Sequence, residues 1–299
     1  MLPAPSTDLH DRSPLGGLSH VQGARQPPLS EHTISQWLDA TAARFPQGLA
    51  CVFREQSIRW TWQQLRDESL KLACGLHHLG LRRGERIGIW SPNRAEWVLT
   101  QYAAARLGLV LVNINPAYRL SELEYALNKV GCRAIITAPE FKTSQYLQML
   151  LSLAPEMERC APGQLRALRL PSLQFIIRMG KAQTPGCFNF ADIMGLADEP
   201  GITLACAISD TLSCHDAINI QFTSGTTGNP KGATLTHHNI VNNARYVARG
   251  MQLTDQDRLA IPVPLYHCFG MVMGSLACTV TGATMVFPSE GFEPRATLQ

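Results

Sequence analysis

The sequence predicts an α/β fold of doubly wound, mostly parallel sheets flanked by helices. Short apolar segments such as 86–90 (RIGIW) and 109–114 (LVLVNI) have the length and composition of buried strands. Amphipathic helical patterns separate these segments. The resulting alternation of strand, helix and strand is typical of βαβ units with right-handed crossovers and helices on both faces of a sheet.

Capping signals indicate where several helices begin. In a capping box, a Ser or Thr side chain and a Glu or Gln three residues later satisfy backbone N–H groups reciprocally. Thr33/Gln36, Thr61/Gln64 and Ser121/Glu124 have this spacing. We therefore expect helices over residues 34–45, 61–79, 91–108, 121–130, 140–153 and 238–249, with another of about ten residues starting near Phe269.

Alternating or continuous apolar runs between these helices predict the strands. The first two expected strands, 50–53 and 58–60, form a hairpin. The later ones are expected at 86–90, 109–114, 134–137, 173–177, 217–222, 232–236, 258–263 and 283–287. Residues 139–212 have the least regular pattern.

The distribution of proline, glycine and serine predicts the domain organisation. Residues 1–30 are rich in these three residue types, and we expect them to form a flexible segment. Residues 31–299 then form the main domain, in which a subdomain boundary could lie at about 180–212.

Composition excludes several classes of protein. The chain has 299 residues, of which 45% are hydrophobic and 16% charged, so it can bury a sizeable core. A net charge of +3 with scattered basic residues does not indicate a nucleic-acid partner. Nine cysteines without a C-x-x-C pair favour a reduced, cytoplasmic protein. Residues 259–289 carry no Asp, Glu, Lys or Arg, but Pro262, Pro264 and Gly282 interrupt them, so we expect no transmembrane segment.

Residues 223–232 read TSGTTGNPKG and carry the strongest chemical signal. Three glycines let backbone N–H groups turn inward, four hydroxyls add donors, and Lys231 adds a positive charge, which together predict a phosphate cradle. A P-loop would need G-x-x-x-x-G-K-[ST] followed by a helix. Here Gly232 follows Lys231 and a strand is expected next, so a P-loop is excluded. The alternative interpretation is that residues 223–232 form a surface hairpin that binds no ligand.

TSGTTGNPKG resembles the phosphate-binding signature of the adenylate-forming (AMP-binding) superfamily, which includes acyl-CoA synthetases, luciferases and the adenylation domains of peptide synthetases. The resemblance implies that ATP binds with Mg2+ bridging its phosphates, and it implies no metal site made by the protein itself. The residues implied to bind ATP are Thr223, Ser224, Gly225, Thr226, Thr227, Gly228 and Lys231.

Three other segments resemble the acyl-CoA synthetase branch. Residues 115–118 (NPAY) with 122–125 (ELEY) are similar to the segment of synthetases that act on aliphatic acids, and 213–222 are similar to the family member 2 type with medium-chain preference. Residues 264–270 (PLYHCFG) resemble the motif whose histidine lies near the reacting carboxylate, which implies this role for His267. An isolated histidine in an apolar stretch is more often a core residue, but His267 follows two prolines and a strand end, where ligands of open α/β sheets bind.

The resemblance implies an acid–thiol ligase. Such an enzyme activates a medium- or long-chain fatty acid with ATP to acyl-AMP and then transfers the acyl group to coenzyme A. The Y-G-x-T-E and T-G-D motifs and the catalytic lysine of the family's later part are not found in this sequence. We therefore expect an N-terminal part, truncated before the C-terminal subdomains, that is inactive without a C-terminal half.

Two other functions stay open at this point. The chain could be a catalytically incomplete phosphate-binding or interaction module. It could also be a different adenylate-forming ligase, although peptide-synthetase domains usually carry an aspartate near the position of His267, and no acidic residue occurs between Arg258 and Glu290.

Overall fold

Two β-sheets form the framework of the computed structural model, which describes residues 26–223 and 230–298. The larger sheet has seven strands in the order β7-β6-β5-β3-β4-β8-β9, and all neighbours are parallel except β8 and β9. Its strands are β3 (Arg86–Trp90), β4 (Val110–Asn113), β5 (Cys132–Thr137), β6 (Phe175–Arg178), β7 (Cys187–Asn189), β8 (Ala217–Thr223) and β9 (Lys231–Thr236). This arrangement confirms the predicted α/β class with mostly parallel sheets.

The smaller sheet joins the two ends of the described chain. Its order is β10-β11-β1-β2, in which β1 and β2 form the expected antiparallel hairpin and β1 pairs in parallel with β11. Its strands are β1 (Leu49–Phe53), β2 (Ile58–Thr61), β10 (Arg258–Ala260) and β11 (Thr284–Phe287). Phe53 stacks on Phe287 with ring centroids 4.4 Å apart.

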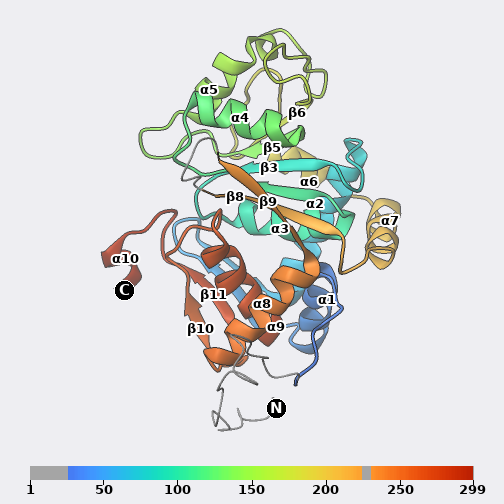
Figure 1. The fold of residues 1–299 in the computed structure, drawn as a ribbon, viewed down its shortest axis with the longest axis vertical. Coiled ribbons are helices and arrows are strands. Elements are labelled where there is room, and N and C mark those ends of the chain that lie inside the picture. Colours follow the sequence, from blue (N-terminus) through green and yellow to red (C-terminus); the bar gives the residue numbers. More distant parts are fainter. Residues whose placement is uncertain (1–25, 224–229, 299) are drawn as a thin grey trace, which may run out of the picture. The chain divides into compact units, whose positions relative to one another are not determined.

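Helices cover both faces of the larger sheet (Figure 1). The chain runs from β3 to β4 and then back past β3 to β5, and right-handed crossovers in opposite directions place their helices on opposite faces. The helices are α1 (Ile34–Arg44), α2 (Trp62–His78), α3 (Ala95–Leu107), α4 (Leu120–Val130), α5 (Tyr146–Leu153), α6 (Phe190–Gly195), α7 (Glu199–Asp210), α8 (His237–Gly250), α9 (Ala277–Thr281) and α10 (Pro294–Leu298). Two shorter or irregular helical segments are η2 (Pro155–Glu158) and η3 (Phe269–Leu276).

Helix α3 lies at the centre of the fold. Twelve of its 13 residues are buried, and it contacts α1, α2 and α7 as well as β3 and β4. Arg106 on α3 forms an ion pair with Asp39 on α1, and the hydroxyl of Tyr102 forms a hydrogen bond with that of Thr279 on α9. A helix that is apolar nearly all round is stable only where other elements surround it.

Three of the predicted helix starts are wrong. The helix expected from residue 91 begins at Ala95, with Arg94 as its N-cap. The helix expected to be capped by Ser121 and Glu124 begins at Leu120, and the carboxylate of Glu122 accepts a hydrogen bond from the backbone N–H of Arg119 at 3.0 Å. The helix expected over 140–153 begins only at Tyr146, because Phe141 and Ser144 exchange two backbone hydrogen bonds of 2.9 Å in a tight turn.

The late helix also differs from its prediction. It starts at Phe269 as a π-helical segment, η3, and continues as α9. Gly270 permits this start, because a Cβ atom at this position would lie 2.5 Å from the backbone oxygen of Pro264. Single π-helical turns occur often at functional sites.

The predicted division between residues 30 and 31 and the predicted subdomain boundary at 180–212 stay predictions.

Candidate active site

The carboxyl ends of β4 and β8 lie side by side, because these strands are parallel neighbours with Asn113 opposite Gln221. The chain enters the TSGTTGNPKG segment at Thr223, the last residue of β8, and returns at Lys231, the first residue of β9. Thr223 pairs with Lys231, and its hydroxyl donates to the Lys231 carbonyl at 3.4 Å. The loop therefore joins two antiparallel strands, as the sequence predicts.

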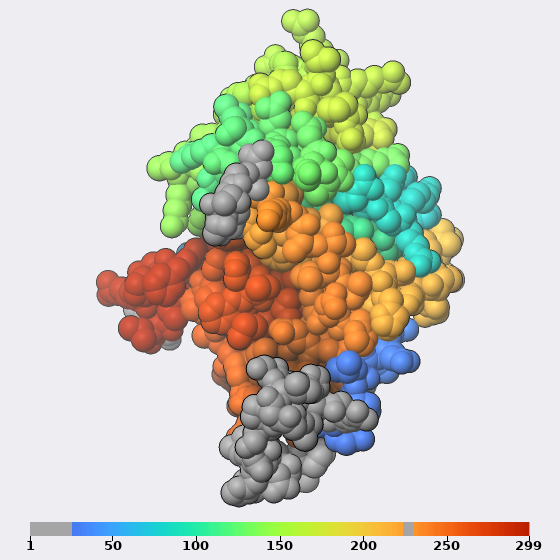
Figure 2. All heavy atoms as spheres, viewed as in Figure 1, coloured from blue at the N-terminus to red at the C-terminus, as the bar shows by residue number. Residues whose placement is uncertain are grey.

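The two described ends of the loop are exposed. Figure 2 shows β9 and α8, in orange, at the surface of the molecule. The remaining residues predicted to bind phosphate, which are Ser224, Gly225, Thr226, Thr227 and Gly228, lie outside the described residues.

A chain of amide side chains connects β8 with the segment that carries His267. Gln221 donates to the Asn219 side chain at 3.1 Å, and Asn219 donates to Asn113 Oδ1 at 3.0 Å. Asn113 in turn donates to the carbonyl of Tyr266 at 3.0 Å. Since Asn113 and Asn219 are buried, these bonds satisfy groups that would otherwise destabilise the fold. These hydrogen-bonded amides therefore hold Tyr266, the residue before His267, next to the phosphate-loop strand β8.

His267 is exposed and is not a core residue. Its Nδ1 accepts a hydrogen bond from the backbone N–H of Phe269 at 3.1 Å, and the Sγ atom of Cys268 lies 3.7 Å from the same nitrogen. A neutral imidazole in this arrangement carries its proton on Nε2. The ring is thus oriented by the start of η3, with one N–H group available as a donor.

A cavity of about 370 Å3 opens beside these strand ends. Its lining comes from the segment after β3, the segment after β4, residues 141–144, the segment 262–266 and residues 290–292. Prolines and Phe141 supply much of the apolar surface, while Arg119 and Lys142 add positive charge. A largely apolar cavity with a few polar groups is the usual form of a small-molecule site.

Asn93 fixes two walls of this cavity. Its backbone N–H donates to the Glu290 carbonyl at 2.9 Å, and its side chain donates to the Val263 carbonyl at 2.9 Å. The side-chain oxygen accepts from the N–H of Leu265 at 2.7 Å. In the described part of the chain, both hydrogen bonds between the 263–265 segment and the end of β3 are made by the buried side-chain amide of Asn93.

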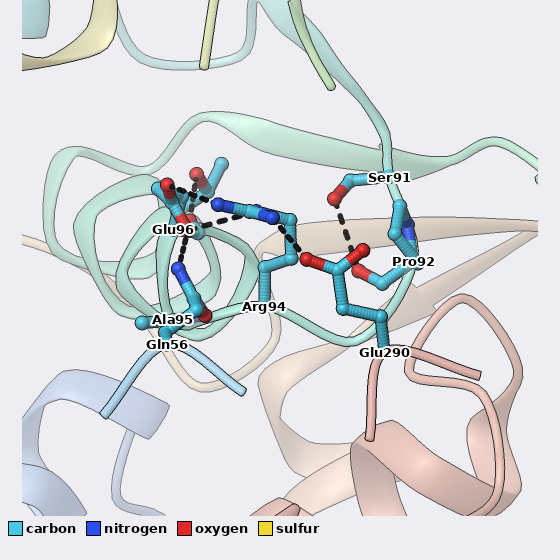
Figure 3. Close-up of polar contacts among 8 residues, drawn as sticks. Gln56, Ser91, Pro92, Arg94, Ala95, Glu96 and Glu290 are labelled. Carbon is cyan, nitrogen blue, oxygen red and sulfur yellow. Dashed lines mark hydrogen bonds and ion pairs between the residues drawn. The ribbon is translucent and has the colours of Figure 1, made fainter. Parts of the chain in front are cut away.

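An ion-pair network of Arg94, Glu96 and Glu290 lies next to the cavity wall that Asn93 and Glu290 form. Arg94 lies between Glu96 and Glu290 and forms ion pairs with both (Figure 3). Gln56, in the β1–β2 hairpin, donates to Glu96 at 2.8 Å and accepts from the N–H of Ala95 at 2.8 Å. Burial raises the pKa of Glu290, although the nearby Arg94 opposes this rise.

The amides Asn93, Asn113, Asn219 and Gln221 were not among the predicted site residues. A signal exists in the sequence for two of them, because Asn113 ends an apolar strand pattern and Asn219 alternates with isoleucines in another. Buried polar residues at strand ends indicate a network, but the pattern does not reveal their partners. Asn113 and Tyr266 are separated by 153 positions.

Comparison with known proteins decides the family. A model of the family described as "AMP-binding enzyme" matches residues 38–299. The chain belongs to the AMP-binding enzyme family. The resemblance inferred from TSGTTGNPKG is thereby confirmed.

Individual relatives agree with this membership. The chain is 45% identical over 291 residues to the protein named "Medium-chain acyl-CoA ligase ACSF2, mitochondrial" of Bos taurus, and 43% identical over 292 residues to that of Homo sapiens. Each match covers 96% of this chain and 47% of the relative. The chain thus spans about half the length of these curated relatives.

Solved structures show the same fold. The anthranilate CoA ligase AuaEII in complex with anthranoyl-AMP matches with a TM-score of 0.74 and 23% identity, over 90% of this chain and 47% of that one. The long-chain-fatty-acid-CoA ligase FadD1 from Archaeoglobus fulgidus matches with a TM-score of 0.72 and 22% identity, over 94% of this chain and 51% of that one. Among the described residues, no helix has both the length and the apolar character needed to cross a bilayer.

Proposed function

We propose that this chain is part of an AMP-forming acyl-CoA synthetase that activates a medium- or long-chain fatty acid with ATP and transfers it to coenzyme A. The observation that carries the proposal is the amide chain from Gln221 to Tyr266, because it brings the end of the phosphate-loop strand and the His267 segment to one edge of the sheet. Identity of 43–45% to proteins named medium-chain acyl-CoA ligases supports the choice of substrate class.

The chemistry follows from the properties of a carboxylate. Its negative charge repels nucleophiles and its oxygen is a poor leaving group, so a thiol cannot displace it directly. The carboxylate oxygen attacks the α-phosphate of ATP, the bond from this phosphorus to the bridging oxygen breaks, and pyrophosphate leaves. The thiol of coenzyme A then attacks the acyl carbon, and AMP leaves.

In this scheme the loop residues bind the departing phosphates. Thr223 and Lys231 hold pyrophosphate from the two strand ends, with Ser224, Gly225, Thr226, Thr227 and Gly228 supplying the donors between them. The described loop ends offer a hydroxyl and an ammonium group rather than a carboxylate, so Mg2+ would be held mainly through phosphate oxygens. When bound, this ion neutralises charge on the phosphates.

His267 is assigned to the acyl carboxylate. Its Nδ1 is engaged by the Phe269 N–H, so the Nε2–H group can donate to a substrate oxygen. The cavity lined by the preceding residue, Tyr266, is large enough for a small molecule, since such sites have volumes of roughly 300–1,000 Å3. Arg119 and Lys142 in its wall favour a substrate that carries negative charge, since the carboxylate of Glu290 in the same wall is paired with Arg94.

Pyrophosphate exchange by the native gene product, measured with labelled pyrophosphate, tests the function, because it reports acyl-adenylate formation. We expect exchange that depends on a medium-chain fatty acid. Exchange with amino acids and none with fatty acids would establish a different adenylate-forming ligase. If the native gene product catalyses no exchange with any acid tested, the non-catalytic phosphate-binding or interaction module is favoured.

Lys231→Ala tests the loop assignment. A charge-assisted hydrogen bond contributes about 1.5–3 kcal/mol, so we expect exchange to fall roughly 10- to 100-fold, while Lys231→Arg keeps part of the activity. Lys129→Ala, at an exposed position of α4, is the matched control and should leave exchange unchanged. Equal exchange in Lys231→Ala and the control would refute the assignment.

The compartment also stays a proposal. Nine free thiols fit the reducing cytoplasm predicted from the sequence. The curated relatives are named mitochondrial proteins. Fractionation of cells that express the native gene product, followed by detection of the chain in cytosol and mitochondria, decides between these compartments.

A further inference from the structure

Three side chains with metal-binding donor atoms converge where α2 ends and α7 begins. They are Cys74, His78 and Asp198, whose donor atoms all lie within 4.8 Å of one another. His78 Nε2 lies 3.4 Å from Asp198 Oδ1, and Cys74 Sγ lies 3.8 Å from the same oxygen. None of these residues belongs to the site at the strand ends.

The secondary structure accounts for the convergence. Cys74 and His78 are four residues apart on α2, so their side chains lie on one face of the helix. Asp198 is the N-cap of α7, and its Oδ1 accepts from the N–H of Gly201 at 2.8 Å. Since α2 contacts α7, the cap is held next to that face (Figure 1).

Gly201 allows the three donor atoms to lie close to one another and to the first turn of α7. A Cβ atom at this position would lie 2.3 Å from Cys74 Sγ, 2.6 Å from Asp198 Oδ1 and 2.8 Å from His78 Nε2. Any other residue would therefore push these donor atoms away from their present positions. A helix cap and an ion pair between His78 and Asp198 would not require a thiol at the same point.

Two of the three donor separations suit a tetrahedral zinc ion, and the third, between His78 Nε2 and Cys74 Sγ, is within 4.8 Å. Zinc binds sulfur at about 2.3 Å and nitrogen or oxygen at about 2.1 Å, which separates N and O ligands by about 3.4 Å and S and O ligands by about 3.6 Å. The observed separations are 3.4 Å and 3.8 Å. The His78 and Asp198 side chains are 39% and 52% exposed, so they can adjust to an ion by small rotations.

A fourth ligand position is available on the outer side. A cavity of about 320 Å3 adjoins His78 and Asp198 and is open to solvent. Arg82 also lines it, and its positive charge opposes a cation, but its Nη1 donates to the carbonyls of His77 and Leu81. A thiolate and a carboxylate together balance the two charges of a divalent ion.

We propose that Cys74, His78 and Asp198 bind a divalent ion of the zinc type, with water as the fourth ligand. Binding replaces the thiol proton of Cys74 by the metal and releases that proton to solvent. One thiolate, one imidazole and one carboxylate form a ligand set that zinc accepts. The ion links the end of α2 to the start of α7 and stabilises their contact.

Titration of the metal-free 299-residue chain with Co2+ tests the site. Cobalt in a tetrahedral site with a thiolate ligand absorbs visible light and shows a sulfur-to-cobalt charge-transfer band, which requires a bound cysteine. We expect one equivalent to bind, and Zn2+ to remove the signal by displacement. A chain that shows no charge-transfer band at micromolar concentrations would overturn the proposal.

Variants locate the site. Cys74→Ser and His78→Asn should each weaken binding by about 100-fold or more, because loss of outer-sphere partners alone costs 10–100-fold. Cys206→Ser is the control. It removes a thiol on α7 that lies outside the cluster, so this variant should bind the metal as wild type does. Unchanged affinity in His78→Asn, whose partly exposed position permits folding, would place the metal elsewhere and refute the proposal.

Discussion

His237 is a titratable residue that the fold keeps neutral. It lies fully buried at the start of α8, where its Nδ1 accepts from the backbone N–H of Ile34 at 3.2 Å. Its Nε2 has no hydrogen-bond partner among the described residues. Burial lowers the pKa of His237 to about 4, although the negative charge of Asp216 acts in the opposite direction.

This lowered pKa predicts a loss of stability in mild acid. Between about pH 6.5 and 4 the unfolded chain binds a proton at this histidine that the folded chain does not, so stability falls as the pH falls through this range. Between pH 7.5 and pH 5 the loss from His237 is on the order of 2 kcal/mol. Urea unfolding of wild type and of His237→Asn at both pH values measures it.

His237→Asn can retain an acceptor for Ile34 but does not titrate, so the stability of this variant should depend less on pH. The comparison removes the contributions of other groups, such as Glu290, whose raised pKa has the opposite effect. Equal pH dependence in both proteins would mean that His237 is not held neutral.

Single residues also show what the sequence can predict about the site. Three glycines, four hydroxyls and Lys231 within ten positions identify a phosphate loop, because few other structures use this combination. Asn93 gives no such signal. Its sequence neighbours suggest only a helix start, and its partners Val263 and Glu290 are more than 160 positions away.

At the scale of elements, a glycine inside α2 marks a close contact between helices. A Cβ atom at Gly75 would lie 2.0 Å from the carbonyl oxygen of Ile193 on α6. The obstacle is backbone, which cannot rotate away as a side chain can. Glycine at this position therefore allows α2 and α6 to pack closely.

Gly75→Ala should destabilise the fold, although alanine is intrinsically the better helix former by about 1 kcal/mol. Overpacking against backbone makes the expected net loss about 2 kcal/mol or more. Gly195→Ala, also in a helix but with no atom within 4 Å of the added Cβ, is the control and should raise stability by about 0.4–1 kcal/mol. A Gly75→Ala variant as stable as the control would show that α6 moves aside freely.

Capping boxes show both the strength and the limit of local prediction. Thr33 and Thr61 each accept from the residue three positions on, as their spacing predicts. The spacing of Ser121 and Glu124 fits equally well, but Arg119 and Glu122 form the cap instead. The preceding turn determines which residues form the cap. In this turn the Ala117 N–H donates to the side-chain oxygen of Asn115, and the Tyr118 N–H donates to the backbone carbonyl of Asn115.

The prediction of a helix from residue 140 was wrong because of a contact with a residue remote in sequence. The ring of Phe141 lies so close to Gly291 that a Cβ there would be 2.9 Å from it. This contact favours the tight turn over a helical start. Such contacts between residues 150 positions apart leave no mark in the local pattern.

At the scale of the whole molecule, the two sheets depend on pairings that are remote in sequence. Strand β1 pairs with β11, whose partners lie 234 positions further along the chain. The βαβ pattern predicted the larger sheet, because its strands alternate regularly with helices. Nothing in the sequence assigned the late strands β10 and β11 to a second sheet with the first hairpin.

Asn93 joins these two sheets where the candidate site lies. It follows β3 of the larger sheet, and its three hydrogen bonds hold Val263 and Leu265, which follow β10, and Glu290, which follows β11. The side chain is 3% exposed, so water cannot replace these bonds without a rearrangement. The position of the 263–267 segment, and with it His267, therefore depends on Asn93.

Asn93→Ala should cost about 2–4 kcal/mol, because it leaves the Val263 carbonyl and the Leu265 N–H unsatisfied in a buried setting. Asn93→Asp keeps the acceptor for Leu265 but loses the donor to Val263 and adds a charge, so it should also destabilise. Asn128→Ala removes one hydrogen bond at an exposed position and should cost less than about 1 kcal/mol. Urea unfolding gives these values, and limited proteolysis should reveal new cleavage within 262–268 in Asn93→Ala alone. If that segment stays protected and stability is unchanged, the remaining contacts hold the sheets together and Asn93 does not position the candidate site.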